Sequence, residues 1–167
     1  MTDDKRRVRS ATQYGPSASA VATNVRRIRE ARGMSIYALS GLLAKSGRPI
    51  AASAVAKIER QERQVTVDDL IALAVALNVS PSALYLPLDD DPSHVIEITG
   101  AGEQPADRAW DWADGQRPLY VRWEKHAEDW TDYHRLSRPP RRGRRQTLAY
   151  IKGVMEEEGL ADGPSVD

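Results

Sequence analysis

The fold is decided by residues 25–39, which have the sequence VRRIREARGMSIYAL. Val25 and Ile28 lie three positions apart, a spacing that places both side chains on one face of a helix. Gly33 follows as the residue type that most readily takes the left-handed conformation ending a helix. Ser35 is a preferred N-cap. The stretch therefore predicts one helix that ends near Gly33 and a second that begins at Ser35.

Apolar residues at helical spacing predict three more helices downstream, over about residues 51–60, 66–77 and 80–86. The helix at Thr66 starts with a capping-box pattern, because Asp69 stands three positions later. Five short helices therefore predict one all-helical domain over residues 21–87.

This domain resembles the lambda-repressor-like (XRE-type) helix-turn-helix DNA-binding domain. Three stretches carry the resemblance: VRRIREARGMS at 25–35 with Leu39 beyond it, VAKIER at 55–60, and DDLIALAVALNVSP at 68–81. The resemblance implies that the third helix lies in the major groove while the second crosses the DNA backbone. The predicted fold class is mainly α: a five-helix domain followed by a small, mostly helical C-terminal extension with one short strand.

The resemblance also implies which side chains face the bases: Ala52, Ser53 and Lys57. Two departures from the family pattern affect this region. The turn before the third helix is lengthened at residues 45–49, and the third helix opens with Ala and Ser where the family tends to have larger polar residues. Ala and Ser cannot make the bidentate contacts of Gln, Asn or Arg, so we expect an unusual mode of base reading.

Predicted phosphate contacts fall into two groups. The first is at the start of the second helix, where backbone amides and the positive end of the helix dipole can meet a phosphate: Ser35, Ile36 and Tyr37. The second consists of arginines that flank the third helix: Arg48, Arg60 and Arg63. The alternative for each arginine is an ordinary solvated side chain.

The resemblance further implies a structural ion pair. In the family, a glutamate at the position of Glu59 pairs with a basic residue of the first helix, and Arg29 occupies that position here. The expected role of Glu59 is therefore to tie two helices together and not to act as a catalytic acid.

Signals of catalysis are missing from the sequence. Cysteine is absent, which excludes disulfides and thiolate metal sites. The three histidines lack metal-ligand spacing, and the chain has neither a Gly-rich phosphate loop nor a Gly-x-Ser-x-Gly motif. We expect no enzyme activity, no cofactor and no metal. Without a long apolar run or a signal peptide, the sequence predicts a cytoplasmic protein that is not attached to a membrane.

The net charge of zero hides charged blocks. Residues 88–115 carry one basic and eight acidic residues, whereas residues 116–152 carry ten basic and four acidic ones. A partner such as DNA can respond to such local charge although the chain is neutral as a whole.

Beyond the helical domain, residues 88–93 form an acidic linker and residues 94–137 a Trp-rich region. Alternating apolar residues at 94–99 predict one strand, whose partner could come from another chain. Helices are predicted from Pro105 to Ala113 and from Pro118 onward. The second of these would carry an aromatic stripe that includes Tyr120, Trp123 and Trp130. The stripe is interpreted as a small core against the first domain, as a self-association surface of a homodimer, or as a platform for single-stranded bases.

Both ends of the chain also contain basic residues. Residues 1–20 are predicted to be a disordered basic arm, and residues 138–167 to be a basic segment, a short helix at 147–160 and an acidic tail. The basic segment is either a second DNA arm or a solvated linker; its candidate DNA contacts are Arg141, Arg142, Arg144 and Arg145.

These patterns favour a transcriptional regulator that binds specific double-stranded DNA, with a prophage or actinobacterial repressor as the expected kind. The alternative is an antitoxin-like module that neutralises a protein partner through its C-terminal region and regulates its own promoter. Neither alternative predicts a catalytic residue.

Overall fold

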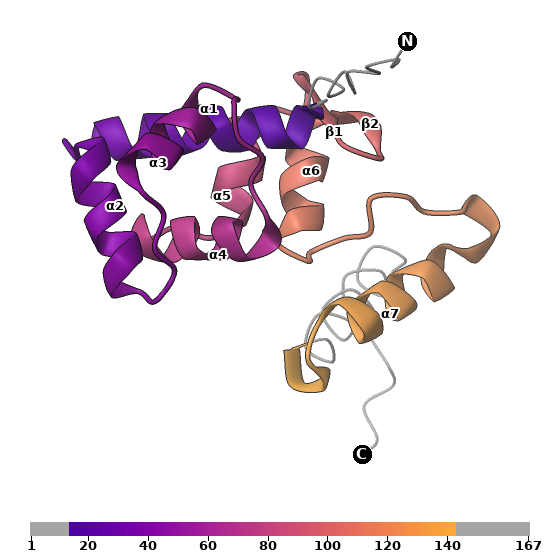
Figure 1. Cartoon of the computed structure of the whole chain (residues 1–167). Helices are drawn as coiled ribbons and strands as arrows, with labels where there is room; N and C mark the ends of the chain where they lie inside the picture. The colour runs from indigo at the N-terminus through magenta and orange to yellow at the C-terminus, as the bar shows by residue number, and fades with distance from the viewer. Residues whose placement is uncertain (1–13, 143–167) are drawn as a thin grey trace, which may run out of the picture. The chain divides into compact units, whose positions relative to one another are not determined.

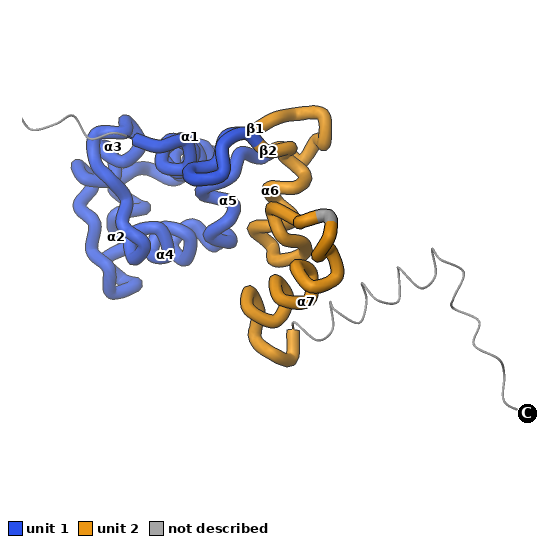
Figure 2. Tube along the Cα trace, turned by 90° about the vertical axis from the view of Figure 1, so that its right-hand side faces the viewer, with its two compact units in different colours: residues 1–88, 97–103 blue, residues 89–96, 104–167 orange. Residues whose placement is uncertain are grey.

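The computed structural model describes residues 14–142. Most of the predicted arm, Arg144, Arg145, the predicted helix at 147–160 and the acidic tail lie outside the described residues. The chain divides into two compact units, which Figure 2 shows in different colours. Unit 1 comprises residues 1–88 and 97–103, and unit 2 comprises residues 89–96 and 104–167. No helix in the described part of the chain has the length and apolar character needed to cross a membrane.

Unit 1 contains five helices among its described residues, labelled in Figure 1: α1 (Pro16–Ala31), α2 (Ile36–Lys45), α3 (Ala52–Glu59), α4 (Val67–Ala76) and α5 (Ser82–Tyr85). Helix α1 packs against α3 and α5, α2 packs against α3 and α4, and α4 packs against α5. Their inner faces form one apolar core whose fully buried members include Val25, Leu39, Leu43, Val55, Leu73, Leu77 and Leu84. The predicted all-helical domain is therefore confirmed.

Local capping explains where these helices begin and end. Gly33 has a φ of +61°, and its backbone N–H donates to the carbonyl of Glu30, which ends α1 as predicted. The Ser35 Oγ accepts a hydrogen bond of 3.0 Å from the backbone N–H of Ala38 and so caps α2. Thr66 caps α4 in the same way, through a 3.1 Å bond from the N–H of Asp69.

The start of α1 differs from the sequence-based prediction. Residues 16–20 were assigned to a disordered arm, but they form the first turns of α1. Pro16 stands in the first turn, where proline is favoured because its missing N–H would have no helical partner there. The residues that follow it are small, so no apolar periodicity indicates this turn in the sequence.

A buried asparagine joins α1 to the segment around α5. The Asn24 side-chain amide donates to the carbonyls of Leu84 at 3.1 Å and Leu86 at 2.6 Å, and its oxygen accepts a bond from Arg27. Buried carbonyls at a helix end need such partners, because water cannot reach them. Asn24 therefore fixes α5 on α1.

The remaining elements are β1 (Val95–Ile98), β2 (Gly102–Pro105), α6 (Ala106–Ala113), the 3-10 helix η1 (Trp123–Lys125) and α7 (His126–Ser137). Strands β1 and β2 form a two-stranded sheet. The sequence predicted a single strand and allowed its partner to come from another chain, whereas the partner is β2 of the same chain. Gly102 and Pro105 are residue types depleted in strands, so no pattern indicates β2.

The predicted helix from Pro118 is shorter than expected. Helix α7 begins only at His126, after the single turn η1. Tyr120 lies before both elements, so it does not share a helical stripe with Trp130. The prediction of one continuous aromatic stripe from Tyr120 onward was therefore wrong. Two kinds of hydrogen bond tie Arg122 to Asp129 of α7 and compete with an earlier helix. The backbone N–H of Arg122 donates to the Asp129 carboxylate at 2.7 Å, and its Nε donates to the same carboxylate at 3.1 Å.

Candidate nucleic-acid interface

Helix α3 presents a face of short side chains with one long cation. Val55 and Ile58 are buried in the core, which turns Ser53 and Lys57 to the solvent. Ser53 and Lys57 are four positions apart and therefore lie one turn apart on the same face. Ala52 is only half-buried, at the start of the helix. All three predicted base-reading residues thus lie on the part of α3 that solvent can reach.

The N-terminus of α2 has three predicted phosphate contacts with different surroundings. Tyr37 is 81% exposed, so its ring is free of the core. Ile36 is half-buried and packs against the core, which leaves only its backbone amide for an anion. Ser35 is exposed, and its hydroxyl already accepts the capping bond. The first amides of a helix have no partner within the helix and favour an anion at this end.

The arginine after α3 is paired with a carboxylate. Arg60 Nε and Nη2 each donate a 2.8 Å hydrogen bond to one oxygen of Glu62. This bonding raises the pKa of Arg60 and lowers the pKa of Glu62. Both side chains are about half exposed. A phosphate that binds Arg60 must therefore share the guanidinium with Glu62 or displace it.

The other two flanking arginines share one buried carboxylate. Arg48 Nε lies 3.0 Å from Asp69 Oδ1, and Arg63 Nη2 lies 3.0 Å from Asp69 Oδ2. The Asp69 side chain is 1% exposed, whereas those of Arg48 and Arg63 are 46% and 35% exposed. The cluster therefore keeps a net charge of +1 and two partly exposed guanidinium groups.

Arg29 and Glu59 join α1 to the end of α3. Arg29 Nε and Nη2 donate to the two Glu59 oxygens at 2.6 and 2.8 Å, and Arg29 Nη1 donates to the Met34 carbonyl at 2.8 Å. Both side chains are at least nine-tenths buried. The hydrogen bond from Arg29 to Glu59 raises the pKa of the guanidinium, so Arg29 stays charged inside the domain.

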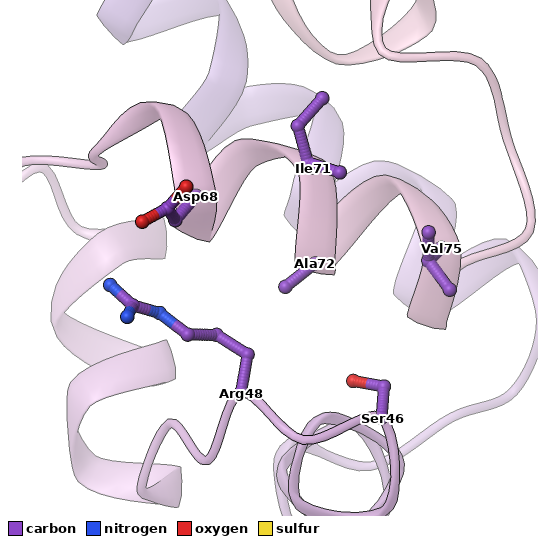
Figure 3. A pocket seen from close by; sticks show the side chains of 6 residues that line it. All are labelled: Ser46, Arg48, Asp68, Ile71, Ala72 and Val75. Carbon is purple, nitrogen blue, oxygen red and sulfur yellow. The ribbon is translucent and has the colours of Figure 1, made fainter.

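Between the lengthened turn and α4 lies a hollow of about 340 Å³. Figure 3 shows its walls: Ser46 and Arg48 on the turn, and Asp68, Ile71, Ala72 and Val75 on α4. Ile71 and Val75 are 45% and 63% exposed, so the apolar side of the hollow is open to solvent. Apolar packing therefore does not close the turn against α4 here.

Among the described candidate residues of unit 2, Tyr120 and Trp130 have different surroundings. Tyr120 is exposed and outside the helices, whereas the Trp130 ring lies between those of His126 and His134, with centroid distances of 6.0 and 5.6 Å. Trp123 begins η1. Arg141 and Arg142 are exposed near the end of the described residues, while Arg144 and Arg145 lie beyond them.

The sequence did not indicate that carboxylates pair with the arginines that flank α3. Glu62 received no role, and Asp69 was expected only to complete a capping box with Thr66. The Asp69 side chain instead binds two arginines, while its backbone N–H binds Thr66. Opposite charges between Arg60 and Glu62, two positions apart, would have indicated that pair. Nothing in the linear sequence indicates that Arg48 and Arg63 meet at Asp69.

Among residues 14–142, no group of three or more His, Asp or Glu side chains is arranged to hold a metal ion.

Comparison with protein-family models finds one family that matches this part of the chain. Residues 25–84, from the middle of α1 into α5, match the family model described as helix-turn-helix, of the XRE or lambda-repressor-like type. The resemblance seen in the sequence is therefore confirmed for this part of the chain. No curated protein and no solved structure matches the chain significantly. The matched family consists of DNA-binding domains of transcription regulators and not of enzymes. The match spans residues 25–84 of the 167 residues.

Proposed function

We propose that the chain represses transcription by binding a specific double-stranded DNA site with α3 in the major groove. In this proposal Ser53 and Lys57 contact base edges, and Ala52 packs against a thymine methyl. The N-terminus of α2 lies on the DNA backbone. The regulator would be of the kind found in prophages and actinobacteria.

One observation carries the proposal most strongly: the exposed side chains of α3 differ in kind from those at its two ends. Ser53 and Lys57 stand one turn apart on the exposed face, and only one of them is charged. The arginines come before and after the helix, where phosphates run on either side of a major groove. This distribution suits a reading helix anchored at both ends.

The test separates base reading from phosphate binding. DNA fragments retained from a random library are sequenced to obtain a selected site, and a scrambled duplex of the same composition serves as the control. Lys57→Ala should weaken binding to the selected site by about 1–3 kcal/mol, with little effect on the scrambled duplex. Arg60→Ala should weaken binding to both duplexes and reduce the salt dependence by about one unit.

Equal losses for Lys57→Ala and Arg60→Ala on both duplexes would contradict the role of α3 as the reading helix. If the wild type retains no DNA from the library, the proposal of sequence-specific binding fails altogether. A reporter gene placed behind the selected site then tests the sign of regulation, because repression predicts that expression falls when the chain is present.

A further inference from the structure

The carboxylate of Asp69 is the point where both connections of α3 meet α4. Arg48 belongs to the lengthened turn that precedes α3, and Arg63 belongs to the segment between α3 and α4. Each donates to a different oxygen of Asp69, over 3.0 Å in both cases. One buried side chain therefore holds the chain on both sides of the reading helix.

The lengthened turn needs such an attachment. On the side of α4 it borders the hollow of about 340 Å³, so side-chain packing does not hold it there. Figure 3 shows Arg48 extending from the turn toward the beginning of α4. The other end of the turn is fixed by Ile50, which is 3% exposed and whose carbonyl accepts a 2.7 Å bond from Ser40. The beginning of the turn is bonded to the end of α2, through Ser46 Oγ to the Leu43 carbonyl at 2.9 Å, so Arg48 is its side-chain attachment to α4. Helix α3 begins at Ala52, two residues after Ile50.

The charge and burial of the cluster suit a positioning role. A carboxylate that is 1% exposed is stable only when its oxygens have partners, and two arginines supply them. Each arginine uses one nitrogen toward Asp69 and remains more than one-third exposed. A guanidinium has five N–H donors, so the remaining donors can face a phosphate while Asp69 holds the group in place.

We propose that Asp69 is a positioning residue for DNA binding: it orients Arg48 and Arg63 at the two ends of α3 and thereby fixes how α3 enters the groove. This inference rests on the proposed function and assigns to the Asp69 side chain a role separate from the capping of α4 by Thr66. The competing account is that Asp69 merely neutralises the arginines and so weakens their attraction to DNA.

The two accounts predict opposite signs for Asp69→Asn. This variant keeps the size of the side chain and removes one negative charge. If Asp69 only competes with phosphates, the variant binds the selected site more tightly, with a steeper salt dependence. If Asp69 positions the arginines, the variant binds the selected site about tenfold more weakly or worse, because base contacts are misplaced. Binding to the scrambled duplex then changes much less, and the salt dependence becomes shallower.

Asp68→Asn is the matched control. Asp68 precedes Asp69 in the first turn of α4 and is exposed, so its replacement changes the charge of the chain by the same amount at nearly the same place. We expect Asp68→Asn to keep the ratio of selected to scrambled affinity. A ratio for Asp69→Asn equal to that for Asp68→Asn would overturn the positioning role.

Arg48→Gln provides a second route if Asp69→Asn does not fold, as judged by far-UV circular dichroism. In this variant Asp69 keeps Arg63, so no buried carboxylate is left without a partner. The positioning role predicts a larger loss on the selected site than on the scrambled duplex, whereas loss of a phosphate contact alone gives equal losses and would overturn it. If the wild-type protein selects no site from the library, the proposed function itself is refuted. If the wild type selects a site but the variants keep its ratio of selected to scrambled affinity, only the positioning role is refuted.

Discussion

Replacement of Glu59 by alanine should destabilise unit 1 by about 2–4 kcal/mol. Breaking a buried ion pair costs about 3–5 kcal/mol, because the remaining charge has no compensation. Here the Arg29 side chain is 10% exposed and would lose two hydrogen bonds, of 2.6 and 2.8 Å. The loss is reduced because Arg29 keeps its bond to the Met34 carbonyl, and because Glu30 already lies 3.5 Å from its Nη2.

The measurement is urea unfolding followed by far-UV circular dichroism. Tryptophan fluorescence is unsuitable, because all four tryptophans lie between residues 110 and 130, outside the helical domain. A loss of this size should also lower the melting temperature by about 10 °C or more for a domain of this length.

The double variant Arg29→Met with Glu59→Leu supplies the control. A buried ion pair can often be replaced by apolar side chains of similar volume at little cost, so the double variant should recover most of the lost stability. A midpoint for Glu59→Ala equal to that of the wild type would refute the reasoning. So would a double variant as unstable as the single one, since the loss would then come from packing and not from an unpaired charge.

Two further predictions concern ion pairs of unit 2 that titrate. His94 Nδ1 donates a 2.6 Å hydrogen bond to the carboxylate of Asp89, and this bond raises the pKa of His94 above 6.5. The contribution of this pair to stability is therefore complete below pH 6.5 and is lost as the pH rises through the raised pKa of His94. NMR titration of the His94 ring should show the raised midpoint, and Asp89→Asn should return this midpoint toward 6.5. The hydrogen bonds from Arg122 lower the pKa of Asp129 from 3.8 to about 2, so this pair contributes above pH 3.8 and is lost as the pH falls toward 2. A carboxyl titration midpoint near 3.8 in the wild type would contradict the second prediction. Arg122→Gln should move the midpoint toward 3.8 without reaching it, because the backbone N–H of residue 122 still donates to Asp129.

The helical domain was predictable because its signals are local. Val25 and Ile28 repeat at the period of a helix, and Gly33 and Ser35 carry the stop and start signals that the structure uses. Each of these signals acts within one or two turns of the chain. A single sequence contains that information in full, which is why the helices of unit 1 were placed correctly apart from the start of α1.

The rest depends on contacts between distant residues. Strand β2 exists because β1 pairs with it, although Gly102 and Pro105 argue against a strand. The late start of α7 is accompanied by a bond between Arg122 and Asp129. The convergence of two arginines on Asp69 joins positions 21 and 6 residues apart in the sequence. Periodicity does not detect such contacts, because it compares only neighbours on one element.

The carboxylates around α3 have a consequence for specificity. Arg60 is balanced by Glu62, whereas Arg48 and Arg63 share the buried carboxylate of Asp69. Attraction to DNA of any sequence grows with the number of charges available to phosphates, so this balance limits binding to random DNA. Phosphate contacts strengthen specific and random binding alike, so discrimination between DNA sites has to come from the base contacts. A reading face with only Ala52, Ser53 and Lys57 offers few base contacts. In the proposed function, the fixed orientation of Arg48 and Arg63 therefore matters because it would place these few base contacts.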